Sequence, residues 1–316
     1  MKADEIYNPK HFVELTEQLK QMESLFQDVE DKDVVRRISK HDVLVRGELS
    51  DLDIIWRRFL KDRQELIDLA PLSRKYLDGE KDINSEEARK VLGRETELTN
   101  SLKVDLKSLF LFSDILFNKF VLLIRAVVNP KRGIEYRSYT SFLKSLGKLD
   151  GSHPESSWEY ALYKNYGEDL ERIDVLLCFY RDKFIVHLSG PYQEGIVRSV
   201  YLPEIRLDHT SWKLSEFDLN KFLELVNALG DIVPKKDKFG RPMDQKSDPR
   251  PKVEALFLNL HRIKDLSLRE RAEGYIRSVG LSTPDIYYLL KTIKDTARDI
   301  ILSLSDFVKQ NYVLGK

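Results

Sequence analysis

The stretch Ser101–Pro130, SLKVDLKSLFLFSDILFNKFVLLIRAVVNP, contains the most apolar helical pattern of the chain. Apolar side chains recur from Leu102 to Val128 at the spacing of a helix rather than in the alternation of a strand. Asn129-Pro130 ends the pattern, because the residue before a proline disfavours helical backbone. The stretch therefore predicts a central helix, Leu102–Val128.

The sequence on both sides of this helix is also predicted to be helical. Only 14 glycines and 11 prolines occur in 316 residues, and long periodic segments dominate, which favours an all-α helical bundle. The other helices we expect are residues 8–30, 50–69, 86–92, 139–149, 157–188, 218–229, 251–279 and 284–312. The first helix has one apolar stripe, formed by Phe12, Leu15, Leu19, Met22 and Leu25. The helix over 157–188 is either continuous or broken near Gly167.

These elements suggest a division of the chain. Residues 234–251, PKKDKFGRPMDQKSDPRP, combine four prolines with no apolar period, which predicts an exposed linker or loop. The linker separates a helical core (101–233), preceded by an N-terminal helical region (1–100), from a C-terminal antiparallel helical hairpin (252–316). We expect the first hundred residues to pack against the core. One small β-hairpin is expected around Pro203, within residues 196–207.

Composition excludes several classes of protein. Basic and acidic residues number 52 each, so the overall charge gives no reason to expect a polyanionic partner. The single cysteine, Cys178, excludes an intrachain disulfide and a cysteine zinc cluster, and favours a cytoplasmic location. No apolar run reaches 18 residues, so we expect no membrane segment. The chain has no HExxH sequence, EF-hand loop or glycine-rich phosphate loop, so we expect no metal and no cofactor.

Local charge departs from this balance in residues 119–148. The segment has seven basic residues and one acidic residue, Glu135. Arg125, Lys131 and Arg132 are candidate contacts for the phosphates of a nucleic acid. The alternative is a solvated helix end and loop without a partner.

A second stretch, CFYRDKFIVHLSG (Cys178–Gly190), places an arginine and a histidine six residues apart in an apolar run. On a helical wheel the apolar residues form one stripe, and Arg181 and His187 border it on opposite sides. The stripe consists of Ile173, Leu177, Tyr180, Phe184 and Leu188. Because Arg181 and His187 would be about 120° and 9 Å apart on a straight helix, they cannot easily grip the same atom. Stripes that meet across a two-fold axis would bring both pairs to one cleft, so we expect a homodimer.

This motif resembles that of the HEPN superfamily (higher eukaryotes and prokaryotes nucleotide-binding), whose all-helical domains share an arginine, four to six intervening residues and a histidine. Here the match is Arg181 to His187, with the polar Asp182 directly after the arginine as is usual in the family. The resemblance covers about residues 100–230. A second segment, Arg36–His41, fits the same spacing but lies in a polar segment between predicted helices, with no apolar stripe to present it.

The resemblance implies a metal-independent endoribonuclease of defence or toxin type, with RNA as substrate and a neutralising protein as a further partner. His187 would move the proton between the 2′-hydroxyl and the leaving 5′-oxygen. Arg181 would hold the phosphate and stabilise the growing negative charge. The products would carry 2′,3′-cyclic phosphate and 5′-hydroxyl ends. Candidate substrate-binding residues are Lys183, Asp182, Arg125, Lys131 and Arg132.

A non-catalytic role is the alternative. Some members of the superfamily are dimerisation or binding modules, and this chain could use the same helix as a dimer seam without cutting RNA. In that case His187 is a hydrogen-bonded core or interface residue, and Arg181 pairs with Asp174 or Asp182.

Overall fold

The computed structural model describes residues 12–128, 138–147, 157–180, 217–237, 239–246, 249–279 and 286–313. Within these ranges the secondary structure is helical and contains no strand, so the predicted all-α fold is confirmed. The α-helices are α2 (Val13–Ser24), α3 (Lys32–Leu77), α4 (Glu86–Val128), α5 (Tyr139–Gly147), α6 (Trp158–Tyr180), α8 (Leu219–Leu229), α9 (Arg250–Asn259), α10 (Leu266–Ser278) and α11 (Ile286–Val308). The expected β-hairpin over 196–207 lies outside the described residues.

Helix α3 is much longer than the predicted helix over residues 50–69, and that prediction is wrong at both ends. The helix begins after Asp31, whose carboxylate accepts hydrogen bonds from the backbone N–H groups of Asp33 and Val34, a standard N-cap. It also continues past Pro71 to Leu77. Beyond the proline, Ser73 and the buried Tyr76 contact α4 residues, and this packing stabilises the last two turns.

Helix α4 joins two predicted helices, 86–92 and 102–128, into one helix of 43 residues. Its expected start is confirmed, since the Ser85 hydroxyl accepts a hydrogen bond from the N–H of Ala88 at 3.1 Å. The predicted boundary between residues 100 and 101 therefore falls inside a continuous helix. The N-terminal hundred residues and the apolar helix share one hydrophobic core.

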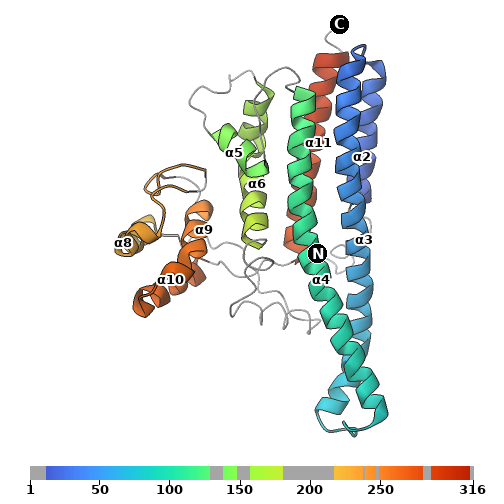
Figure 1. Cartoon of the computed structure of the whole chain (residues 1–316), viewed down its shortest axis with the longest axis vertical. Helices are drawn as coiled ribbons and strands as arrows, with labels where there is room; N and C mark the ends of the chain where they lie inside the picture. Colours follow the sequence, from blue (N-terminus) through green and yellow to red (C-terminus); the bar gives the residue numbers. More distant parts are fainter. Residues whose placement is uncertain are drawn as a thin grey trace.

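Helices α3 and α4 form a long antiparallel hairpin, which is the longest feature of the molecule (Figure 1). Gly79, with φ of +78°, lies in the connecting turn and adopts a conformation that favours glycine. Polar pairs join the two helices in the half of the hairpin nearer the turn: Arg58–Asp105, Asp62–Ser101, Glu65–Arg94 and Ser73–Glu95. These pairs fix the register of one helix against the other.

Helices α2 and α11 complete a bundle with this hairpin, at the end of the hairpin away from the turn (Figure 1). The predicted stripe on α2 is largely confirmed, because Phe12, Leu15, Leu19 and Met22 are buried and Leu25 is half-buried. Helix α11 packs against α2, α4 and α6. Among the described helices, none is both long and apolar enough to cross a membrane.

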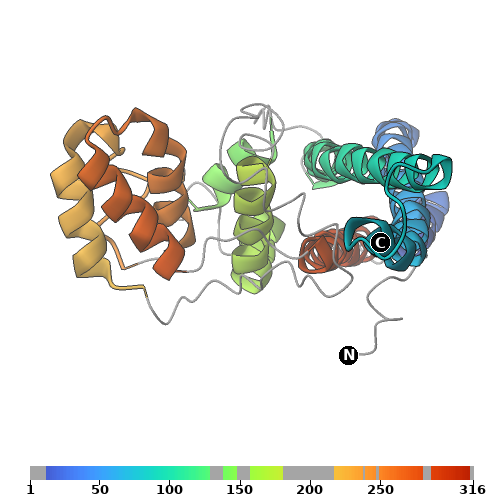
Figure 2. The ribbon, with the colours of Figure 1, turned by 90° about the horizontal axis from the view of Figure 1, so that it is seen from below.

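The predicted C-terminal hairpin over 252–316 is wrong. The expected helix 251–279 is interrupted between α9 and α10, which pack against each other, while α10 also contacts α8. Local signals predicted a helix over 284–312 but could not show that α11 packs on α2, α4 and α6, which lie far away in the sequence. Figure 2 shows α5 and α6 between that bundle and the group formed by α8, α9 and α10.

A buried carboxylate at the α2–α3 interface makes stability depend on pH. The Asp42 side chain is buried beside Arg46, with 2.7 Å between Oδ2 and Nη2, and Arg46 also reaches Glu23 on α2. Burial raises the pKa of Asp42 to about 6, against the opposing effect of Arg46. The folded state favours the protonated form of Asp42. Protonated Asp42 therefore contributes stability that is fully present below about pH 4 and is lost as pH rises through 6.

We therefore expect Asp42→Asn to gain thermal stability relative to the natural chain as pH rises from 4 to 7. The expected gain in relative Tm is about 2 °C or more, because 1 kcal/mol shifts Tm by roughly 2–4 °C in chains of this size. Melting curves at several pH values measure it. Glu86→Gln, which removes an exposed carboxylate at the start of α4, is the control and should show no such trend. A constant difference between Asp42→Asn and the natural chain would contradict the prediction.

Candidate functional site

Most of the predicted site residues lie outside the described residues: Arg181, Asp182, Lys183, His187, Lys131 and Arg132. Arg125 is described and lies half-buried on α4. The described part of α6 extends to Tyr180, the residue directly before the arginine of the motif. The described structure therefore shows how the helix leading into the motif is held.

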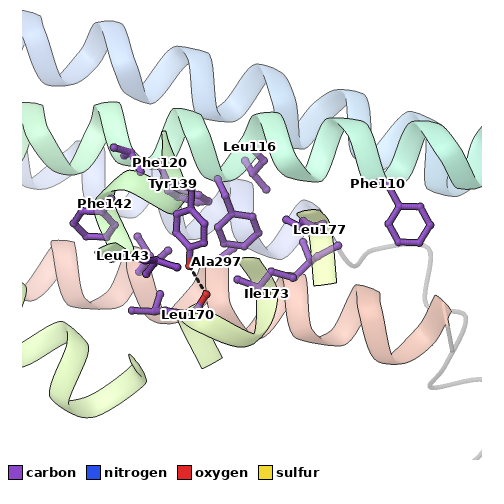
Figure 3. Packing of buried hydrophobic residues seen from close by; sticks show 14 of the residues in the cluster. Phe110, Leu116, Phe120, Tyr139, Phe142, Leu143, Leu170, Ile173, Leu177 and Ala297 are labelled. Carbon is purple, nitrogen blue, oxygen red and sulfur yellow. Dashed lines mark hydrogen bonds between the residues drawn. The ribbon is translucent and has the colours of Figure 1, made fainter. Parts of the chain in front are cut away.

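One face of α6 packs on the bundle. Ile173 and Leu177 are fully buried, and Figure 3 shows them among side chains of α4, α5 and α11. Tyr139 of α5 fixes the position of α6 along its own axis relative to α4. Its hydroxyl donates to the Leu170 carbonyl of α6 at 3.1 Å, and its N–H donates to Asn118 Oδ1 of α4 at 2.9 Å. The expectation that Ile173 and Leu177 belong to a dimer seam is therefore wrong, because their own chain covers them. The homodimer itself stays a prediction.

Asp174 lies on the side of α6 that faces α5. Its side chain is buried, and Oδ1 accepts a hydrogen bond from the Thr140 hydroxyl at 2.8 Å. Asp174 is thus engaged by α5, and its suggested pairing with Arg181 stays a prediction.

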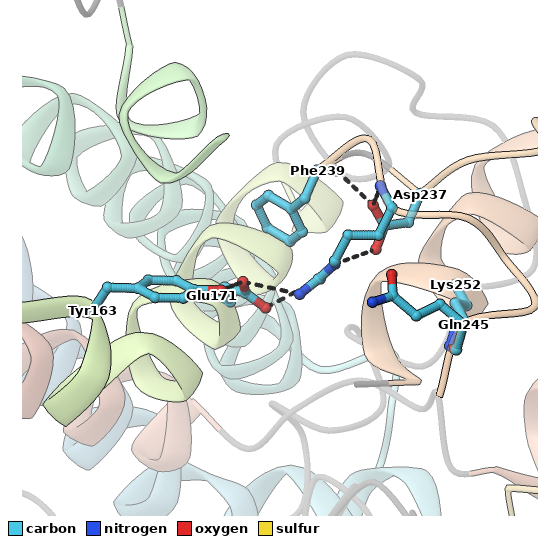
Figure 4. A network of polar contacts seen from close by, with 7 residues as sticks. Tyr163, Glu171, Asp237, Phe239, Gln245 and Lys252 are labelled. Atoms are coloured by element: carbon cyan, nitrogen blue, oxygen red, sulfur yellow. Dashed lines mark hydrogen bonds and ion pairs between the residues drawn. The ribbon is translucent and has the colours of Figure 1, made fainter. Parts of the chain in front are cut away.

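The side of α6 away from Ile173 and Leu177 carries a buried ion pair. Glu171 is 4% exposed, and both of its carboxylate oxygens accept hydrogen bonds from Arg241 at 3.2 Å. Arg241 also donates to Asp237 Oδ2 at 2.9 Å, and its guanidinium lies 5.0 Å from the ring centre of Phe239. Figure 4 shows this network reaching from α6 to the loop before α9. Arg241 therefore joins the loop to α6 through Glu171, while its contacts with Asp237 and Phe239 lie within the loop.

The loop itself is more ordered than the predicted exposed linker over 234–251, and that part of the prediction is wrong. Asp237 Oδ1 accepts from the backbone N–H groups of Phe239 and Arg241, closing a tight turn at Gly240. Phe239 and Met243 are buried. Lys252 at the start of α9 is fully buried and donates to the Gln245 carbonyl (Figure 4). Local composition did not reveal the contact that ties this loop to α6, since Glu171 and Arg241 are 70 residues apart in the sequence.

Gly167 lies in a continuous α6, which settles the alternative of a break at this position. The Tyr163 ring lies against Gly167, where an added Cβ would be 3.1 Å from the ring. From there the Tyr163 hydroxyl donates to Glu171 Oε1 at 2.6 Å. The absence of a side chain at Gly167 thus lets Tyr163 lie along the helix and complete the hydrogen bonding of Glu171.

Arg125, on α4, lies near the start of α6, whereas Tyr180 is at the other end of α6. Trp158, at the start of α6, packs on Phe307, and Phe307 packs on Tyr312. The Tyr312 hydroxyl donates a hydrogen bond to the Val127 carbonyl, close to Arg125 on α4. Helix α6 therefore runs antiparallel to α4. Tyr139 bonds to both Leu170 and Asn118, so these two residues lie at about the same height along the paired helices. Tyr180 lies ten residues to one side of this level and Arg125 seven residues to the other. At 1.5 Å per residue they are about 25 Å apart along the helix axes.

The second segment with the motif spacing, Arg36–His41, lies within α3 and not between helices, so the reason for setting it aside is wrong. Ile38 in this segment is buried in the core. His41 Nδ1 is buried and has no hydrogen-bond partner. Burial lowers the pKa of His41, and the charges of Lys40, Arg125 and Lys119 lower it further. The structure thus brings Arg125 to a histidine that the sequence did not select.

Comparisons with protein-family models, with curated proteins and with solved structures found no match to this chain. Within the part of the chain that the structure describes, no three histidine, cysteine or carboxylate side chains are placed to hold a metal ion. The candidate site therefore rests on the residues of this chain alone.

The Glu171–Arg241 contact is expected to stabilise the fold measurably. In a double-mutant cycle with Glu171→Gln and Arg241→Gln, we expect a coupling free energy of about 1–3 kcal/mol, because the charges are buried and hydrogen-bonded. Chemical denaturation measures it. The control cycle, Arg269→Gln with Glu273→Gln, concerns a more exposed ion pair of α10 and should give about 0.5 kcal/mol or less. Equal coupling in both cycles would show that the network does not hold the loop on α6.

Proposed function

We propose that the chain is a metal-independent endoribonuclease of HEPN type, with Arg181 and His187 as its catalytic residues. The observation that carries the proposal is the place of the motif, directly after a helix that is buried on two sides within an all-helical fold. Ile173 and Leu177 secure one side of that helix, and Glu171 secures the other. A helix held in this way can present the residues that follow it in a reproducible position.

The two side chains suit cleavage by the neighbouring 2′-hydroxyl of RNA. That oxygen attacks phosphorus, the bond from phosphorus to the 5′-oxygen breaks, and a 2′,3′-cyclic phosphate and a 5′-hydroxyl result. His187 accepts the 2′-hydroxyl proton and returns a proton to the leaving oxygen, since imidazole titrates near neutral pH. The planar guanidinium of Arg181 binds two phosphate oxygens and stabilises their charge in the transition state.

A second copy of the chain is part of this proposal, because Arg181 and His187 are about 9 Å apart along a straight helix. Ile173 and Leu177 are packed within their own chain, so the contact between copies would involve residues after Tyr180. Each half of the composite site then combines side chains from both copies, and RNA is the substrate class.

We expect His187→Ala to slow single-turnover RNA cleavage by about 10²-fold or more, because general acid–base catalysis contributes 10²–10⁴. Arg181→Lys keeps the charge but loses the paired donors, and should also cleave poorly. Both variants should still bind RNA. Gel analysis of end-labelled RNA, with and without EDTA, measures rates and product ends.

His261→Ala, which changes a histidine in the turn Leu260–Arg262 after α9, is the matched control and should keep full activity. Cleavage that persists in His187→Ala would refute the assignment. Wild-type protein that binds RNA and cuts none of a broad set of structured and single-stranded RNAs would support the non-catalytic binding module instead.

A further inference from the structure

Exposed residues form one continuous row along α3. Successive members are three or four residues apart, which is the spacing that keeps side chains on one side of a helix. The row consists of Arg36, Lys40, Val43, Gly47, Ser50, Ile54, Arg57 and Lys61, all of them exposed. Helices α2 and α4 pack on other sides of α3, so this side faces solvent over about 37 Å, at 1.5 Å per residue. We call it the α3 row.

The centre of the α3 row is apolar and flat. Val43 is 57% exposed and Ile54 is 59% exposed, which places them among the most exposed large apolar side chains of the described chain. Gly47 and Ser50 lie between them, and a Cβ added at Gly47 would meet no atom within 4 Å. Since the space above Gly47 is open and its neighbours are small, another helix can approach α3 closely here.

Helix α4 widens this apolar surface. Arg58, one turn after Ile54, bonds to Asp105 across the seam between the helices. Val104 directly precedes Asp105, and Leu111 follows Val104 by two turns; they are 58% and 39% exposed. On helical wheels Ile54 lies about 40° from Arg58 and Val104 about 100° from Asp105, in both cases toward solvent. Because the helices are antiparallel, these rotations bring the exposed apolar side chains of both helices to the same flank.

Both ends of the α3 row are basic. The cations are Arg36 and Lys40 at one end, and Arg57 and Lys61 at the other. Arg57 pairs with Asp53 at 2.9 Å, whereas the other three cations form no ion pair or hydrogen bond with the described residues. The row contains no carboxylate, and Asp51 is an exposed one beside it, although the whole chain has as many acidic as basic residues. The α3 row therefore favours a partner with negative charge.

A second copy, an RNA and a protein helix are the occupants to compare. Two α3 rows packed on each other, in either direction, would place cations against cations at both ends. An RNA backbone would cross about 16 Å of apolar centre between Val43 and Ile54, where among the side chains of the row only the Ser50 hydroxyl can bond a phosphate oxygen. A helix with one apolar stripe and flanking carboxylates fits both the centre and the ends.

We propose that the α3 row, with Val104 and Leu111 beside it, binds an acidic amphipathic helix of another protein. The apolar stripe of the partner packs on the apolar centre of the row, and its carboxylates pair with the cations at the two ends. The surface is separate from the Arg181–His187 motif, and its existence does not rest on the proposed cleavage.

A designed peptide tests this surface on the full chain. The probe is a labelled amphipathic helix of about four heptads, with leucine and alanine in its stripe and glutamate on both sides of it. We expect saturable binding in fluorescence anisotropy, and Ile54→Glu should weaken it about tenfold or more, because it places a repelling charge on the buried stripe. Leu302→Glu changes an apolar side chain of α11 that is 46% exposed, and should change affinity less than twofold.

Two further sets of variants separate shape from charge. Gly47→Trp fills the open centre of the row and should weaken the peptide about fivefold or more, whereas Gly47→Ala should change affinity much less. Lys40→Glu combined with Lys61→Glu should weaken the acidic peptide and strengthen a matched peptide that carries lysine in place of glutamate. Circular dichroism checks that each variant keeps its helices.

The same variants identify other occupants. Absence of saturable peptide binding, or equal weakening by Ile54→Glu and Leu302→Glu, would overturn the proposal. Self-association in light scattering that Ile54→Glu removes would assign the α3 row to a second copy instead. A single-stranded RNA decamer, or vesicles containing phosphatidylserine, that bind more tightly than the peptide and lose binding in Ile54→Glu would contradict a protein partner.

Discussion

Helix α6 has apolar side chains on more than one face, and each face needs a separate surface to bury it. Ile173 and Leu177 are covered by the bundle, whereas Val175 and Glu171 are buried from another direction, where α9 and the loop before it lie. The buried charge of Glu171 makes the second contact specific, because it needs Arg241 in one place. The arrangement of the α8, α9 and α10 group relative to the bundle depends on this double contact.

Local rules predicted the elements whose ends are set by short-range chemistry. Ser85 caps α4, Asp218 caps α8 by accepting hydrogen bonds from the N–H groups of Asn220 and Lys221, and the predicted helix Leu102–Val128 lies within α4. Pro71 shows the limit of such rules. It was expected to follow the end of a helix, but packing of Tyr76 against α4 residues keeps the helix going. Local signals likewise predicted a helix over 284–312 without identifying the neighbours of α11.

The candidate sites show the same limit. Two segments have an arginine and a histidine at the spacing of the motif, and sequence context alone favoured Arg181–His187 over Arg36–His41. The structure places His41 on a long helix beside Lys119 and Arg125. No spacing rule could predict that meeting, because it depends on the register between α3 and α4. The pattern that could have revealed it is the set of interhelical polar pairs, which becomes readable only once the antiparallel hairpin is known.

Native-state amide hydrogen exchange tests directly whether α6 is the shared core helix. If both of its faces are held as described, the amides of Leu170, Ile173 and Leu177 should exchange only through openings as costly as those that expose Leu109 and Leu116 in the centre of α4. Opening of the α8–α10 group alone, at lower free energy, should leave these amides protected. Exchange of the α6 amides together with that group, while α4 remains protected, would contradict the account.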